Sequence, residues 1–267
     1  MTPTELLAHL WDDYVASTPQ AQRIHQLLAA RGERVRNDHV ALRSYGVPAL
    51  GIAALARPFE AAGWRPRESY RFGDKHLRAR YWQHPDPQLP KVFISELIVE
   101  ELAAPAQALI AALVAQVPAG LGERADLPWS GRPWRLTQAT YQQLLAHSEY
   151  AAWVAAFGFR VNHFTVDVSA LTSFAGLPEL NAFLQDAGFA LNASGGVIKG
   201  SAAEHLEQSS TLADAVDVTF DDGVARLPSC YYEFALRHRL PTGELFHGFV
   251  PASANKIFES TDVAQQR

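Results

Sequence analysis

The chain has 267 residues, of which 48% are hydrophobic and 19% are charged, and its formal net charge is −5. This composition is typical of a folded globular protein, and the lack of a basic block argues against nucleic acid or an anionic membrane as a partner. The single cysteine excludes an intramolecular disulfide and a cysteine-rich metal site.

The first part of the chain predicts helices followed by a strand, a helix and three more strands. Thr2 and Glu5 form a capping box with Pro3 between them, which predicts one broken helix or two over residues 4–30. A strand is predicted at 35–45, a helix near 50–62, and strands near 65–71, 77–83 and 91–99. We therefore expect an N-terminal helical segment at 1–34 and a βαβββ-like module at 35–102.

The second part of the chain repeats this order after a helical insertion at 103–158. Helices are predicted over 103–117 and 136–157, and a connector with Pro, Gly and Trp joins them. A strand at 159–168, a helix at 177–187 and strand candidates at 189–193, 215–220 and 229–238 follow. The order of elements, without a sequence repeat, indicates a second βαβββ-like module at 159–262. The expected fold is a single α+β domain over 1–267 with added N-terminal and central helices.

Three ionisable residues stand inside predicted strands. They are His39 in VRNDHVALRSY, His163 in FRVNHFTVDV and Glu233 in CYYEFALR. A charge or an imidazole in the middle of a packed strand costs free energy unless something compensates it. Two imidazoles and one carboxylate from three strands would suit Fe(II) and leave coordination positions open. A pseudo-twofold axis between the two modules would bring these three side chains into one cavity. We therefore interpret them as a metal site, with hydrogen-bonded core or surface residues as the ordinary alternative.

Alternation along the strands selects the neighbours of these residues. Arg43 shares the face of His39, and Arg237 shares the face of Glu233, because residues two and four apart point the same way. The planar fork of Arg43 suits a bidentate carboxylate. Cys230 falls on the face opposite Glu233, which favours a core residue over a nucleophile.

Two further features have a functional and an ordinary interpretation. Glu96 in VFISELIVE lies on the last strand of the first module, as Glu233 does in the second, and would be a fourth metal ligand, an outer-shell base or an ion-pair partner. The segment 192–201, with Lys199, and the QSST motif, with Ser209, would present amides and a cation to an anion, or form only a tight turn.

A serine hydrolase is the rival interpretation of these residues. No G-x-S-x-G and no H-E-x-x-H occurs in the sequence. A catalytic triad would therefore rest on Ser194 or Ser209 without the sharp turn that normally exposes such a nucleophile.

The motifs NDHVALRSY, FISEL, VNHFTVDV, GGVIKGS, QSST, YYEFALRHR and GFVPASANKIFEST occur in this order over residues 1–262. Together they resemble the bacterial 2-oxoadipate dioxygenase/decarboxylase family, which also has plant plastid relatives. The resemblance implies a vicinal-oxygen-chelate-like fold, in which paired βαβββ modules form a curved sheet or half-barrel.

The resemblance also implies residue roles. The family's metal ligands fall on His39, His163 and Glu233, and its substrate-binding arginine falls on Arg43. In that reaction Arg237 or Lys199 would contact the distal carboxylate of the substrate. Apart from the resemblance, Ser209 is a further candidate substrate contact, and Glu96 is a candidate catalytic residue because of its place in the first module. The implied reaction uses Fe(II) and O2 to convert a 2-oxo acid, 2-oxoadipate for the family, into 2-hydroxyglutarate and CO2.

Other functions stay open on the same fold. A redox-neutral metalloenzyme, such as a glyoxalase-like isomerase or a hydrolase, would use Glu96 as a fourth ligand and hold Zn(II) or Ni(II). A binding protein without a redox metal is the third possibility. The helical N-terminus and six tryptophans would also allow a homodimer.

Location is expected from absent signals alone. Glu5, Asp12 and Asp13 stand where a signal peptide would need a basic start and an apolar stretch. No run approaches the about 18 apolar residues of a membrane-spanning helix. We therefore expect a cytoplasmic protein whose partners are small molecules.

Overall fold

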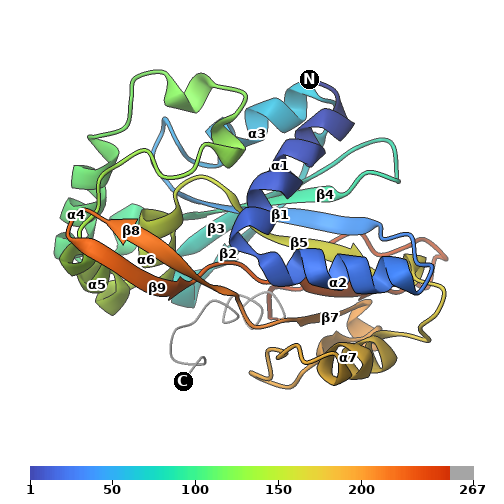
Figure 1. Ribbon diagram of the computed structural model, residues 1–267. Coiled ribbons are helices and arrows are strands. Elements are labelled where there is room, and N and C mark those ends of the chain that lie inside the picture. Colours follow the sequence, from blue (N-terminus) through green and yellow to red (C-terminus); the bar gives the residue numbers. More distant parts are fainter. Residues whose placement is uncertain (253–267) are drawn as a thin grey trace.

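A computed structural model of the chain describes residues 1–252 as a mixed α+β fold around one curved, eight-stranded sheet (Figure 1). Short 3-10 turns connect some of the α-helices and β-strands. In chain order these helices and strands are α1 (Pro3–Ser17), α2 (Pro19–Ala30), β1 (Asn37–Tyr45), α3 (Ile52–Ala61), β2 (Arg65–Phe72), β3 (Leu77–Gln83), β4 (Lys91–Leu97), α4 (Ala104–Val114), α5 (Gln138–His147), α6 (Glu149–Phe157), β5 (Val161–Asp167), α7 (Leu177–Asp186), β6 (Lys199–Ser201), β7 (Leu206–Ser210), β8 (Ala215–Phe220), β9 (Gly223–Pro228) and β10 (Glu233–Arg237).

The strand order of the sheet contains two related halves. It runs β2-β3-β4-β1-β5-β10-β7-β6, so each half places its first and last long strands at the centre. β1 pairs with β4 in parallel and β5 pairs with β10 in parallel, whereas β1 and β5 meet in an antiparallel seam. The halves are β1-α3-β2-β3-β4 and β5-α7-β6-β7-β10. This confirms the expected pair of βαβββ modules in a half-barrel.

The second module differs from the prediction in three strands. Residues 189–193 form no strand, and Leu191 makes only an isolated bridge to Thr211. The module's inner strands are β6 and β7, in the segment that the sequence indicated as an anion-binding loop or a turn. β6 has three residues, one of them Gly200, which is too short for an alternating pattern to show.

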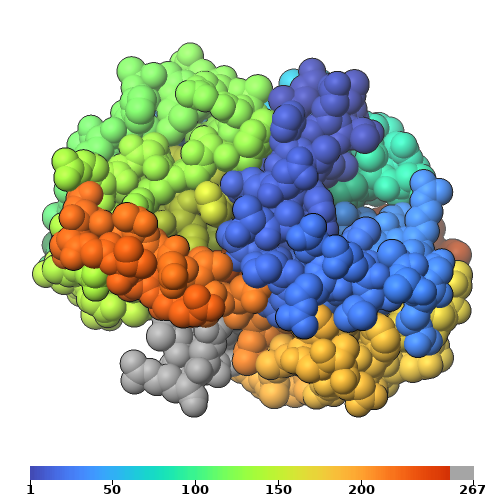
Figure 2. Space-filling model, in the orientation of Figure 1, coloured from blue at the N-terminus to red at the C-terminus, as the bar shows by residue number. Residues whose placement is uncertain are grey.

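The predicted strand at 215–220 exists but belongs elsewhere. It is β8, and it pairs only with β9 in a two-stranded ribbon inserted between β7 and β10. Figure 2 shows this ribbon in orange on the surface, beside the green residues of the helical insertion. The alternating buried and exposed residues of β8 correctly predict a strand, but such a pattern does not indicate which strand it pairs with.

Side chains cap the N-terminal ends of α1 and α6, and a proline begins α2. Thr2 and Glu5 form the predicted capping box, with the Glu5 amide donating to Thr2 Oγ1 at 3.3 Å. The segment 4–30 is two helices, because Pro19 begins α2 directly after Thr18. The predicted helix at 136–157 is also two, since the Ser148 hydroxyl caps α6 by accepting from the Ala151 amide at 3.1 Å.

Helices α1, α3 and α7 pack on one face of the sheet, and the site lies on the other. Trp11 and Tyr14 of α1 pack on Phe164 of β5, with ring centroids 5.2 Å from it. Asn181 of α7 accepts a hydrogen bond from Ser209 of β7 at 2.7 Å. The opposite face therefore carries His163, the strand neighbour of Phe164.

Two predictions fall partly outside the described residues. The end of the second module at residue 262 and the last part of GFVPASANKIFEST lie within 253–267. Within residues 1–252, none of the helices has the length and apolarity that crossing a membrane requires.

Candidate metal centre

His39, His163 and Glu233 come together at the centre of the sheet. They lie on the adjacent strands β1, β5 and β10. The register pairs both His39 and Glu233 with Thr165 of β5, two residues from His163. Register partners share a face, so all three side chains project from the face that α1, α3 and α7 leave uncovered.

The ligand atoms of these residues are close enough to hold one metal ion. His163 Nε2 lies 3.3 Å from Glu233 Oε2, and His39 Nε2 lies 3.6 Å from Glu233 Oε1. All the ligand atoms lie within 4.8 Å of one another, and the residues are 3%, 4% and 1% exposed. Adjacent ligands of an octahedral ion at about 2.1 Å would stand roughly 3 Å apart. The two histidine–carboxylate distances lie near this spacing, so the three residues could hold one divalent ion.

The hydrogen bonding of Glu233 also fits a bound cation. Its Oε1 accepts a hydrogen bond from Gln208 Nε2 at 2.6 Å. Its Oε2 is buried and accepts no hydrogen bond from any residue in 1–252. A buried carboxylate oxygen without a donor is costly, and a bound cation would compensate it. Two histidines and one carboxylate are the ligand set of non-haem Fe(II) oxygenases.

The residue before each histidine orients its ring. Asp38 Oδ1 lies 2.8 Å from His39 Nδ1, and Asn162 Oδ1 lies 2.9 Å from His163 Nδ1. Each oxygen accepts from an Nδ1–H group, which leaves a lone pair on Nε2 available to a metal. The Nε2 atom of His39 also lies 3.0 Å from Thr165 Oγ1, whose hydroxyl can donate to it. This pair of neighbours was missed in the sequence, although the dipeptides Asp38-His39 and Asn162-His163 stand at corresponding positions of the two modules.

The surroundings of the site keep the His163 imidazole neutral and the Asp38 carboxylate charged. Burial, then the charges of His39 and Arg43, hold the pKa of His163 well below its usual range, so its imidazole is neutral as a metal ligand must be. Burial raises the pKa of Glu233. Burial would also raise the pKa of Asp38, but Arg237 and Lys91 hold it well below its usual range.

Arg43 lies at the α6 end of the same face. Its guanidinium carbon stands 5.0 Å from the ring centroid of Tyr150 and 5.1 Å from that of Trp153, and Nη1 lies 3.4 Å from Glu149 Oε1. The aromatic walls desolvate this cation, and it is close enough to His163 to lower the pKa of that residue. The sequence placed Arg43 beside the histidines correctly.

The other predicted substrate contacts are placed differently. Lys199 is on the triad face, in register with Gln208, and its amine donates to the carbonyl oxygen of Asn192. Ser209 points away from the triad, toward α7. The serine on the triad face is Ser210, which pairs with Glu233. Arg237 shares the triad face, but four hydrogen bonds tie it to Asp38 and to the backbone.

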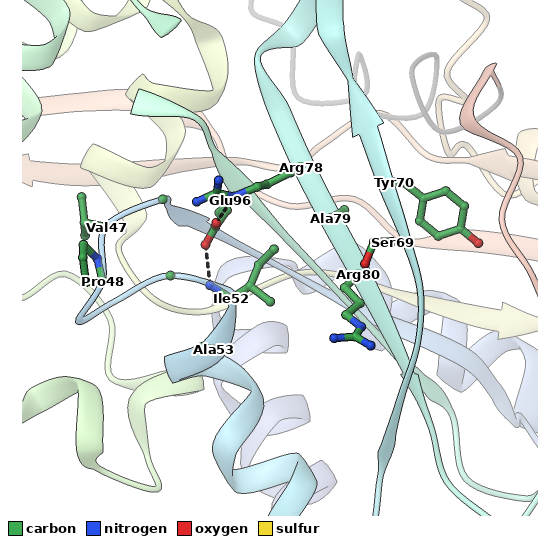
Figure 3. A pocket seen from close by; sticks show the side chains of 12 residues that line it. Val47, Pro48, Ile52, Ala53, Ser69, Tyr70, Arg78, Ala79, Arg80 and Glu96 are labelled. Carbon is green, nitrogen blue, oxygen red and sulfur yellow. Dashed lines mark hydrogen bonds and ion pairs between the residues drawn. The ribbon is translucent and has the colours of Figure 1, made fainter. Parts of the chain in front are cut away.

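Glu96 also lies on the far side of the sheet. Figure 3 shows its carboxylate between Arg78 and the amide of Ile52, the first residue of α3. It lines a cavity of about 430 Å³ that does not include the triad. The predicted correspondence between Glu96 and Glu233 is wrong. Glu233 pairs with the residue two after His163, and the equivalent partner on β4, two after His39, is Phe93. Of the three roles expected for Glu96, the structure shows the ion pair.

The two βαβββ modules define a fold of the vicinal-oxygen-chelate class. A glyoxalase superfamily protein from Ralstonia eutropha JMP134 shares it, with a TM-score of 0.76 at 20% identity over 91% of this chain and 84% of that one. The chain belongs to the 2-oxoadipate dioxygenase/decarboxylase family, whose model matches residues 4–120 and 128–245.

Similar proteins carry the family's name. The chloroplastic/amyloplastic 2-oxoadipate dioxygenase/decarboxylase of rice is 36% identical over 93% of this chain and 75% of its own length. The structure of a rice hydroxyglutarate synthase in complex with 2-oxoadipate superposes with a TM-score of 0.93 at 34% identity, over 98% of this chain and 92% of that one. A structure from Shewanella frigidimarina NCIMB 400, provisionally called a hydrolase, has a TM-score of 0.90 at 48% identity, over 94% and 98%.

Proposed function

We propose that this protein is an Fe(II)-dependent dioxygenase that decarboxylates a 2-oxo acid, with 2-oxoadipate as the substrate. One observation carries the proposal. A buried set of two imidazoles and one carboxylate oxygen without a hydrogen bond stands in a chain that is similar to a synthase solved with 2-oxoadipate. The reaction would give 2-hydroxyglutarate and CO2. One atom of O2 would enter the new carboxylate, and the other would form the hydroxyl group.

The chain's own residues would prepare the site for this chemistry. His39, His163 and Glu233 would hold Fe(II), which supplies the redox chemistry with O2 when it is bound. Asp38 and Asn162 keep the Nε2 atoms of the two histidines facing the triad. Gln208 fixes one oxygen of Glu233 and leaves the other for the metal.

Arg43 would bind a carboxylate of the substrate. It is the cation that lies on the triad face between two aromatic rings, where low solvent access strengthens its attraction for an anion. Lys199, on the same face, would interact with the distal carboxylate, whereas Ser209 faces α7 and has no part in this proposal.

The redox-neutral alternative loses its main support. It needed Glu96 as a fourth ligand, but Phe93 occupies the position on β4 that corresponds to Glu233. Among the described residues the site therefore offers three ligands from protein side chains, and three ligands would leave coordination positions for substrate and O2, as an oxygenase requires.

The test is O2 uptake by protein reconstituted with Fe(II) under anaerobic conditions. A panel of 2-oxo acids of different lengths, including 2-oxoadipate, is added with air-saturated buffer, and O2 and CO2 are measured together. We expect uptake that depends on substrate, with one CO2 released for each O2. Tight metal binding without O2 uptake for any acid would instead indicate a redox-neutral metalloenzyme.

A further inference from the structure

Arg237 makes an extensive set of contacts close to the metal centre. It lies on β10, four residues after Glu233, and is 5% exposed. Its Nε and Nη2 donate to the two carboxylate oxygens of Asp38, at 2.6 and 2.9 Å. This is the bidentate geometry in which an arginine fixes both the position and the plane of a carboxylate.

Asp38 passes this constraint to a metal ligand. Its Oδ1, which accepts from Arg237, also accepts from His39 Nδ1 at 2.8 Å. β10 and β1 are not neighbours, because β5 lies between them. The Arg237 side chain therefore reaches across β5 and connects the strand of Glu233 to the strand of His39.

We infer that Asp38 and Arg237 are positioning residues for His39: Arg237 holds the Asp38 carboxylate, which holds the imidazole with Nε2 facing the metal. The inference rests on the proposed metal function of the triad. A carboxylate that accepts from the far nitrogen of a histidine fixes its tautomer and makes the ligating nitrogen more basic. The Nδ1 atom of His163 faces the neutral Asn162, so of the two histidines only His39 has a charged partner at Nδ1.

The same arginine places the segment that covers His39. Its Nη1 donates to the carbonyl oxygens of Phe246 and Gly248, at 3.2 and 2.7 Å. The ring of Phe249 then lies edge-on against His39, with centroids 5.0 Å apart. A residue with all these protein partners has a structural reason for its burial that does not require a substrate carboxylate.

The test measures metal affinity in the absence of substrate. Wild type, Asp38→Asn, Arg237→Gln and the double variant are titrated with Co(II), and binding is followed by the visible absorption of the ion. Asn at position 38 reproduces the neutral partner that His163 already has, so the side chain fits. Asp13→Asn is the matched control. Asp13 lies on α1, away from the triad, and its carboxylate also pairs with an arginine, Arg160, at 3.4 Å.

We expect Asp38→Asn to weaken Co(II) binding by about 10- to 100-fold and to change the absorption spectrum. Arg237→Gln should weaken binding several-fold, although removal of a nearby positive charge would by itself strengthen it. The double variant should bind no more weakly than Asp38→Asn, because Arg237 acts through Asp38. If a single variant fails to fold, the double variant still tests the inference, since it leaves neither partner of the pair as an unpaired charge.

Three results would overturn the inference. One is an unchanged Co(II) affinity in Asp38→Asn and in the double variant. Another is tighter binding by Arg237→Gln. The third is an Arg237→Gln variant with normal metal affinity and a raised KM for 2-oxoadipate, which would make Arg237 a substrate contact. Failure of the wild type to bind Co(II) at all would refute the proposed function itself, which separates the two failures.

Discussion

Arg43 is a buried cation between the rings of Tyr150 and Trp153, and we propose that it binds a carboxylate of the substrate. Replacement by lysine keeps the charge but loses the planar fork. We expect Arg43→Lys to raise KM for the 2-oxo acid by about 10- to 100-fold. This corresponds to the loss of one charge-assisted hydrogen bond, which contributes about 1.5–3 kcal/mol. Co(II) affinity should stay unchanged, because Arg43 is not a ligand.

Steady-state kinetics and a Co(II) titration check the Arg43 prediction together. Arg36→Lys is the control, since Arg36 is a half-exposed arginine that pairs with Asp167. An Arg43→Lys enzyme with normal KM, or with weakened metal binding, would contradict the role given to Arg43.

Cys230 is a buried thiol with no place in the mechanism. Burial raises its pKa to about 11, and its Sγ donates to the carbonyl oxygen of Val161 at 3.3 Å. The folded-state pKa lies above that of an unfolded cysteine, so the neutral thiol stabilises the fold fully below about pH 8.5 and this contribution is lost as pH rises toward 11.

We therefore expect Cys230 to be unreactive toward a disulfide reagent at pH 8 in the folded protein. In about 6 M urea one thiol per chain should react within minutes, which provides the internal control. Between pH 9 and 11 the free energy of unfolding should fall by about 2 kcal/mol from this group. Rapid modification of the native protein at pH 8 would show that the thiol is accessible.

At the scale of the elements, Glu96 works for helix α3. Its Oε2 accepts from the Ile52 amide at 2.6 Å, and its Oε1 pairs with Arg78. Gly51, before α3, has no side chain to cap the helix, and a Cβ there would collide with the Glu96 carboxylate. Glu96 thus supplies the cap from a neighbouring strand.

Glu96→Gln should lower the free energy of unfolding by about 1 kcal/mol, which corresponds to roughly 2–4 °C in Tm for a chain of this size. Co(II) affinity and O2 uptake should not change. Thermal unfolding and metal titration on the same preparations measure both effects. Weakened Co(II) binding at unchanged Tm would return Glu96 to the metal site.

The order of the elements could be predicted from the sequence, whereas the surroundings of some site residues could not. Order, alternation and capping residues predicted both modules and the placement of Arg43 beside His39, because these depend on local spacing. Ser209 and Glu96 were given the wrong surroundings, because their faces depend on strand register. Register is set by pairing between distant segments, here Ser209 with Phe234 and Ser44 with Glu96. Glu96 lies three residues after Phe93 on β4, and an odd number of residues along a strand places a side chain on the opposite face of the sheet.

At the scale of the whole molecule, the metal site lies across the seam between the modules. His39 belongs to the first module, and His163 and Glu233 belong to the second. Val40 pairs with Phe164 at the middle of the seam, where the pseudo-twofold relation of the two histidines places its axis. A bound ion would therefore join the two halves of the sheet directly, in addition to the Arg237–Asp38 pair that crosses the same seam.

Such a connection should appear as a metal-dependent gain in stability. An ion that binds only the folded state contributes about 2.7 kcal/mol at 100 times its Kd, which predicts a rise in Tm of roughly 5–11 °C for a chain of this size. We expect Fe(II) under anaerobic conditions, or Co(II), to produce this shift, and a chelator to reverse it. His163→Ala serves as the control: its metal-free Tm should remain close to that of the wild type, whereas metal should no longer raise it. An equal metal-induced shift in His163→Ala would mean that the ion binds elsewhere, and that the triad across the seam does not hold it.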